Sequence, residues 1–177
     1  GDYLVFMDSD DVFIDGSGSL VANVIQSEPD ASVLFFRCKE MKSSELIGPA
    51  CESRYITFVE LLNNGTPGEC LPVVSRKIFL LHPYNVELRG CESLTYLKIA
   101  SEGKKIYLSD KIVRGYCSDG HDRLSSKPNI AKRAKLLLLY NLKLLKYYRA
   151  MSLKVLAKTL LKIVKYSATS IINSFLR

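Results

Sequence analysis

Several features that would place a protein in a familiar class are missing or scarce in this sequence. It has no tryptophan and two histidines, and its five cysteines include no C-x-x-C pair. These cysteines argue against a disulfide framework or a structural zinc site and favour a reducing, cytoplasmic compartment. No charged-then-apolar leader opens the chain, and no uncharged apolar run approaches about 18 residues. We therefore expect neither a signal peptide nor a transmembrane span.

Acidic residues are absent from the last part of the chain. Residues 128–177 hold 11 of the 25 Lys and Arg and none of the 18 Asp and Glu, which leaves a charge of −4 for residues 1–127. The net charge of +7 therefore conceals a mildly acidic body and a tail of charge +11. We divide the chain into a body, residues 1–127, and a basic helical tail, residues 128–177.

The body alternates apolar segments with short amphipathic ones. We predict strands over residues 2–7, 31–38, 71–75, 106–108 and 112–116, and helices over residues 20–26, 57–62, 76–81 and 92–101. The run DYLVFM is typical of a buried strand in a parallel sheet covered on both faces, and serines at the start of the first helix are available as caps. A polar turn is expected between the last two strands. This alternation predicts an α/β fold, with helices from residue 130 onward.

Three carboxylates, Asp8, Asp10 and Asp11, crowd the end of the first predicted strand. Ligands of open α/β sheets bind beyond the strand ends, and adjacent like charges need a cation or hydrogen-bond donors. Oxygen ligands alone favour Mg²⁺ or Mn²⁺, which also bind substrate phosphates. An EF-hand calcium loop fails on spacing, because Phe13 or Ala22 stands where a glycine or a ligand belongs. A strand that ends in a polar, capped turn is the remaining alternative.

The segment GDYLVFMDSDD resembles the D-x-D region of family 2 glycosyltransferases, where a G-x-Y-hydrophobic strand ends in (L/M)-D-S-D-D. The resemblance implies an incomplete, GT-A-like mixed sheet followed by C-terminal amphipathic helices. It also implies metal-dependent transfer of a sugar from a nucleotide-diphosphate-sugar donor to a cell-envelope or polysaccharide acceptor, either a glycan or a lipid-linked molecule. By the same resemblance, Asp8 contacts the nucleotide-sugar, Asp10 binds the Mn²⁺ or Mg²⁺ ion at the diphosphate, and Asp11 is an auxiliary ligand.

A second segment, RGCESLTYLKIASEGKKIY, is similar to a downstream pattern of that family, in which a Glu-Asp pair opens a helix and the Asp is the general base. The chain departs from this pattern at both positions, since Cys91 replaces the Glu and Glu92 replaces the Asp. The resemblance implies that Glu92 is the base and that His121 contacts the metal or the diphosphate. From the residues alone, the better explanation of Glu92 is a first-turn residue favoured by the helix dipole, and an exposed loop histidine with no special role explains His121 at least as well.

The resemblance covers roughly residues 1–127 and does not include the upstream strands that grip the nucleotide in this family. We therefore expect a fragment, a truncated gene product or the downstream half of a split enzyme, with weak donor binding by itself. The alternative function is a non-catalytic, membrane-associated or scaffold remnant of the same fold.

The tail places four lysines, Lys154, Lys158, Lys162 and Lys165, on one helical face beside a broad apolar band. A lysine-rich amphipathic helix suits an anionic membrane surface and predicts a peripheral position on the inner face of the membrane. Helices that pack their leucines on the body, with solvated lysines, are the equal alternative. No nucleic-acid motif accompanies the charge, so we expect no nucleic-acid partner.

Overall fold

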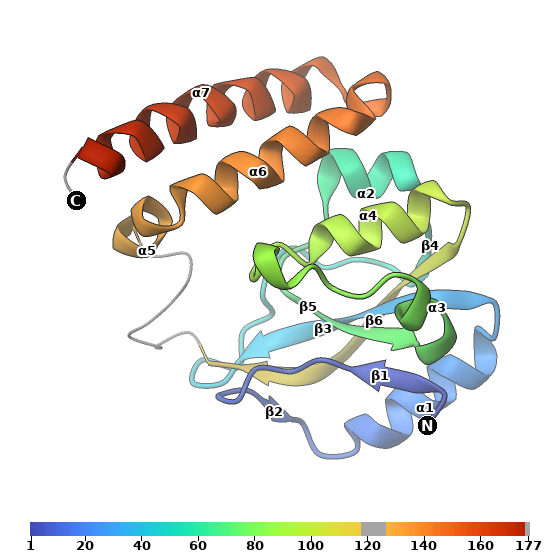
Figure 1. Cartoon of the computed structure of the whole chain (residues 1–177). Helices are drawn as coiled ribbons and strands as arrows, with labels where there is room; N and C mark the ends of the chain where they lie inside the picture. Colours follow the sequence, from blue (N-terminus) through green and yellow to red (C-terminus); the bar gives the residue numbers. More distant parts are fainter. Residues whose placement is uncertain (118–126, 176–177) are drawn as a thin grey trace. The chain divides into compact units, whose positions relative to one another are not determined.

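A computed structural model describes residues 1–117 and 127–175 of the chain (Figure 1). The chain forms two compact units. The first comprises Gly1–Pro83 and Tyr96–Gly120, and the second comprises Tyr84–Thr95 and His121–Arg177. Each unit is described by itself.

The first unit is built on a mixed sheet that, within the described residues, has six strands in the order β1-β5-β3-β6-β2, with β4 paired to β6. The strands are β1 (Tyr3–Val5), β2 (Val12–Phe13), β3 (Ala31–Glu40), β4 (Arg54–Ile56), β5 (Cys70–Ser75) and β6 (Lys105–Tyr116). Strands β3 and β6 are parallel, whereas the other pairs are antiparallel. The predicted mixed sheet with C-terminal helices is confirmed.

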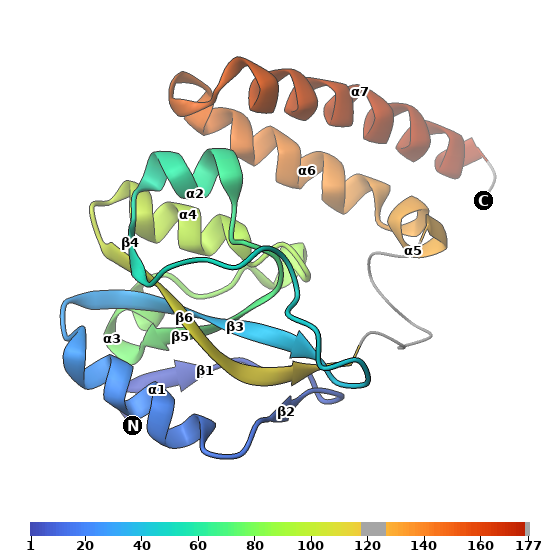
Figure 2. The ribbon, with the colours of Figure 1, turned by 180° about the vertical axis from the view of Figure 1, so that it is seen from behind.

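The central strand β3 is buried on both faces, as its apolar sequence predicts. Its side chains alternate between the faces, and Leu34 and Phe36 join a core with Leu71 of β5 and Val113 of β6. Helix α1 (Ser17–Ser27) covers one face of the sheet, and helices α2 (Phe58–Asn64) and α4 (Ser93–Ser101) cover the other (Figure 2). Helix α3 (Arg76–Leu81) has the predicted bounds.

The prediction that the first strand is a buried, parallel strand is wrong. Among the described strands, β1 pairs only with β5, and it runs antiparallel to it at the edge of the sheet. Val5 is consequently 40% exposed. A continuous apolar run indicates that the segment forms a strand, but the number of strands that pair with it depends on chain segments far away in the sequence.

The predicted turn between two late strands is also wrong, because residues 105–116 form one long strand, β6. Its pairing with β3 jumps from Phe35–Leu108 to Arg37–Ile112, so the polar residues between bulge out of the ladder without ending it. Ser53 stabilises the bulge by donating to the Asp110 carboxylate at 2.7 Å and accepting the Asp110 N–H at 2.8 Å.

One helix start is stabilised by contacts within a few residues, and another by a contact with a distant strand. Thr57 and Glu60 form a capping box at the start of α2, in which each side chain accepts the other residue's backbone N–H. Helix α1 begins at Ser17, earlier than predicted, after Gly16 with a φ of 78°. Contrary to the capping prediction, the buried Ser17 hydroxyl donates to the Val113 carbonyl at 2.8 Å and ties α1 to β6.

The second unit is helical in its later part. It contains the short 3-10 helix η1 (Val86–Leu88), then α5 (Lys127–Lys132), α6 (Ala134–Leu144), η2 (Leu145–Ala150) and α7 (Leu153–Phe175). Helices α6 and α7 lie side by side, joined through η2. No helix in the described part of the chain is long and apolar enough to cross a membrane.

Candidate functional site: the acidic loop

The acidic loop, residues 8–11, connects β1 to β2 and closes as a tight turn, with the Asp11 N–H donating to the Asp8 carbonyl at 3.2 Å. Strand β2 then pairs with Arg114 and Gly115 near the end of β6. A side chain at position 115 would meet Val12 and Met41 at 3.1 Å, so the glycine permits this close pairing. The loop is thereby held against the end of β6. The predicted cluster at the end of the first strand is thus a defined turn.

The three carboxylates of this loop lie in different environments. Asp8 and Asp10 are exposed, whereas Asp11 is buried at 6% exposure. Asp11 Oδ1 accepts the backbone N–H of Cys117 at 3.0 Å, and Oδ2 lies 3.1 Å from Arg114 Nη1. This second contact is one of charge, since Oδ2 has no aligned donor among the described residues. Burial raises the pKa of the Asp11 carboxyl above its usual 3.8, against the lowering by the Cys117 N–H and by Arg114.

Arg114 is the partner that sequence reasoning missed. Its side chain is 5% exposed, its Nε donates to Cys38 Sγ at 3.1 Å, and its guanidinium lies 5.3 Å from the centre of the Tyr116 ring. Its Nη2 also lies 3.9 Å from the exposed Glu69 carboxylate. An arginine inside the apolar segment KIVRGY was the available signal, because a buried charge requires a partner.

Two side chains of the loop, those of Asp8 and Asp10, are of a type that binds a divalent ion. Asp8 and Asp10 present exposed carboxylates, and Mg²⁺ or Mn²⁺ usually takes one or two carboxylates and completes its shell with waters and phosphates. Within residues 1–117 and 127–175, no three His, Cys, Asp or Glu side chains group as a metal site. Asp11 faces protein partners with both oxygens, and its role as a ligand stays a prediction. His121 lies outside the described residues.

The predicted base, Glu92, belongs to the second unit, directly before α4. Its Oε1 accepts the backbone N–H of Gly90 at 2.8 Å, and Gly90 has a φ of 79°. Cys91 is buried, and burial raises the pKa of its thiol. The segment is also held by Arg133, which donates to the Arg89 carbonyl. The carboxylate thus has a defined position within its own unit.

Burial also makes two thiols of the first unit, those of Cys38 and Cys70, poor nucleophiles. It raises the pKa of Cys38, and it raises that of Cys70 to about 12. Both residues belong to the sheet, and Cys38 serves as the acceptor for Arg114. Cys38 is a residue of the buried core, whereas Cys70 is half-buried.

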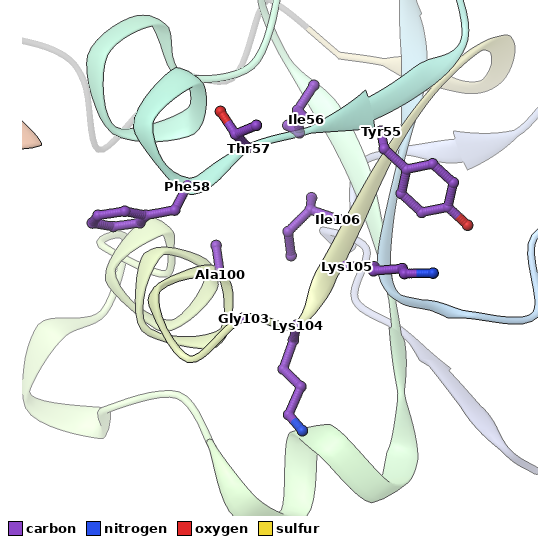
Figure 3. Close-up of a pocket in the computed structure, with 9 residues that line it drawn as sticks. All are labelled: Tyr55, Ile56, Thr57, Phe58, Ala100, Gly103, Lys104, Lys105 and Ile106. Carbon is purple, nitrogen blue, oxygen red and sulfur yellow. The ribbon is translucent and has the colours of Figure 1, made fainter.

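A pocket of about 300 Å³ lies at the start of β6, at the end opposite to the strand's contact with the acidic loop (Figure 3). Residues of β4, α2, α4 and β6 line it, among them Ile56, Phe58, Ala100 and Ile106. The amine of Lys105 is bound to Asp30 at 2.6 Å, and no carboxylate belongs to the lining. This pocket is therefore a different site from the acidic loop.

Comparison with known proteins gives one line of support, from structure. No family model matches the chain, and no curated protein matches it by sequence. The chain is similar in structure to the glycosyltransferase S. aureus TarS, in its crystal structure of residues 1–349, with a TM-score of 0.56 and 15% identity. The similarity covers 96% of this chain and 49% of the chain in that crystal structure, so this chain spans about half the length of that structure. The fold is therefore similar to that of a glycosyltransferase.

Proposed function

We propose that this chain is the metal-binding part of a family 2-type glycosyltransferase, which transfers a sugar from a nucleotide-diphosphate donor to a cell-envelope or polysaccharide acceptor. The observation that carries the proposal is the position of the segment DSDD. In a glycosyltransferase-like fold, this segment forms the turn between β1 and β2, with two exposed carboxylates and one buried, anchored carboxylate.

Asp8 and Asp10 would hold Mn²⁺ or Mg²⁺ and the donor diphosphate. The bound ion supplies positive charge that offsets the charge developing on the leaving diphosphate. Asp11 has a different function in this proposal. Its contacts with Arg114 and the Cys117 N–H fix the turn, so that the two exposed carboxylates keep a constant geometry. His121 is proposed as a further contact of the metal or the diphosphate.

Glu92 is proposed as the general base that takes the proton of the acceptor hydroxyl. A glutamate has the required chemistry, and the hydrogen bond from Gly90 restricts the directions in which its carboxylate can point. The same contact, with buried Cys91 at the neighbouring position, favours the second candidate function, a non-catalytic remnant, because Glu92 then simply closes the turn before α4.

Direct titration with Mn²⁺, followed by electron paramagnetic resonance, tests the metal site without requiring turnover. The intact chain is expected to bind Mn²⁺, and Asp10→Asn is expected to weaken that binding at least about tenfold. Even the mutation of a residue that only hydrogen-bonds to a metal ligand lowers metal affinity about 10–100-fold. Asp15→Asn is the matched control, because Asp15 is also an exposed acid near the loop. Equal affinities for the protein and the Asp10→Asn variant would contradict the metal assignment.

A further inference from the structure

The apolar band of helix α7 is divided between two faces. One face packs toward α6 and contains the buried Thr159, with Val155, Leu156, Ile163 and Tyr166 half-buried. The other face is exposed, and we call it the outer stripe. It consists of Leu153 (87% exposed), Leu160 (47%), Leu161 (70%), Val164 (69%), Ile171 (57%) and Ile172 (57%). Leu153, Leu160, Val164 and Ile171 recur at intervals of seven, four and seven residues, which keeps them on one face of the helix, and Leu161 and Ile172 lie beside them.

The four lysines of α7 form a row beside this outer stripe. Lys154, Lys158, Lys162 and Lys165 are all exposed, and they recur at intervals of four, four and three residues. From helical geometry, the lysine row lies about 100° further around the helix than the middle of the outer stripe. The helix has 23 residues and is therefore about 35 Å long. The outer stripe extends from Leu153 to Ile172, and an exposed apolar stripe bordered by cations is unusual on a surface that meets only water.

We propose that the outer stripe and the lysine row of α7 dock the protein on an anionic phospholipid bilayer, with the helix lying in the plane of the interface. The stripe would enter the boundary between headgroups and acyl chains, while the lysines bind lipid phosphates beside it. This inference concerns location and does not rest on the transferase chemistry proposed above.

The charge of the tail selects this occupant over others. Residues 128–177 carry 11 positive charges and no acid, so an extended anionic plane complements the tail, and the lysine row faces such a plane over residues 154–165 of α7. A second copy of the chain would bring the same charge, and like charges oppose that contact. Nucleic acid would satisfy the lysines but would leave the six apolar side chains of the outer stripe without a partner.

Co-sedimentation of the intact chain with vesicles tests the proposal. Binding is expected to vesicles of phosphatidylglycerol and phosphatidylcholine, to weaken between about 50 mM and about 500 mM salt, and to be absent from pure phosphatidylcholine. Replacing the four lysines of the row by glutamine is expected to raise the apparent Kd roughly 100-fold or more. The matched control replaces Lys77, Lys98, Lys104 and Lys111, four exposed lysines of the first unit, and should have a much smaller effect.

Insertion of the outer stripe is tested separately from charge. The double variant Leu161→Gln/Val164→Gln alters two exposed residues, so its circular dichroism should match that of the unmodified protein while its vesicle binding falls at least tenfold. The chain has no tryptophan, so Leu161→Trp provides a single reporter whose emission should shift to the blue on vesicles. Leu80→Trp, exposed on α3, should not shift.

Three results would overturn the proposal. The first is an intact chain that ignores anionic vesicles at low salt. The second is a loss of binding that is as large for the first-unit lysines as for the lysine row. The third is a concentration-dependent dimer that the double variant Leu161→Gln/Val164→Gln no longer forms, together with an absence of vesicle binding. The outer stripe would then be an interface between two copies of the chain.

Discussion

Removing the guanidinium of Arg114 should reveal how strongly the acidic loop depends on one buried contact. In Arg114→Met the volume is largely kept, but Asp11, whose side chain is 1% exposed, loses its only cationic neighbour within 4.0 Å among the described residues. Breaking a buried ion pair from one side costs about 3–5 kcal/mol, because the remaining charge is left without compensation. We therefore expect the free energy of unfolding in urea at neutral pH to fall by about that amount.

The pH dependence of this loss gives a sharper test. Without Arg114, burial and the charges of Asp8 and Asp10 should raise the pKa of Asp11 further above 3.8. A carboxyl whose pKa is raised by folding contributes stability below the pKa of the unfolded chain, and that contribution is lost as the pH rises through the folded value. The deficit of Arg114→Met should therefore be small near pH 4 and grow toward pH 7.

Two further variants control this experiment. Glu69→Gln should change stability by less than about 0.5 kcal/mol, because Glu69 is 57% exposed and lies 3.9 Å from Arg114. Arg114→Met/Asp11→Asn should recover part of the loss, with a coupling of about 0.5–3 kcal/mol. A loss below about 1 kcal/mol for Arg114→Met, or one that is equal at both pH values and not recovered by Asp11→Asn, would refute an anchoring role of the pair.

Four other predictions follow from single side chains. Glu92→Gln should lower turnover of a nucleotide-sugar about 100-fold while donor binding persists, and near-normal kcat would reassign the base. Leu34→Ala, at 0% exposure on β3, should destabilise the fold by about 2–5 kcal/mol in urea, unless the core collapses to fill the cavity. Thr57→Ala should cost about 1 kcal/mol by removing the cap of α2, and an unchanged midpoint would show the cap to be dispensable. The pKa of Glu60 is lowered from 4.5 by the Thr57 N–H and by Arg54. The ionised Glu60 therefore contributes to the free energy of unfolding above about pH 4.5, and this contribution is lost as the pH falls through the lowered pKa. Glu60→Gln should accordingly reduce the change in stability over this part of an acid titration.

The part of this fold that could be predicted from sequence is its local part. The bounds of α3, the helix after Thr57 and the buried strand β3 follow from periodicity, capping residues and a β-rich apolar run, all of which act within a few residues. The acidic segment and the lysine spacing of α7 were equally readable. The resemblance carried by DSDD gave the type of fold, which the structural similarity to TarS supports independently of sequence.

Only the tertiary structure decided which of these residues meet. The pairing of β1 at a sheet edge and the unbroken course of β6 depend on strands that are distant in the chain, and no local pattern encodes them. Asp11 resembles its neighbours in sequence, but it is buried by contacts with Arg114 and with Cys117, which lies 106 positions away. In the same way, helical spacing gave α7 its apolar band, while packing on α6 determined which side of it remains exposed. Sequence determines propensity within a segment, whereas burial and pairing are shared properties of segments that folding brings together.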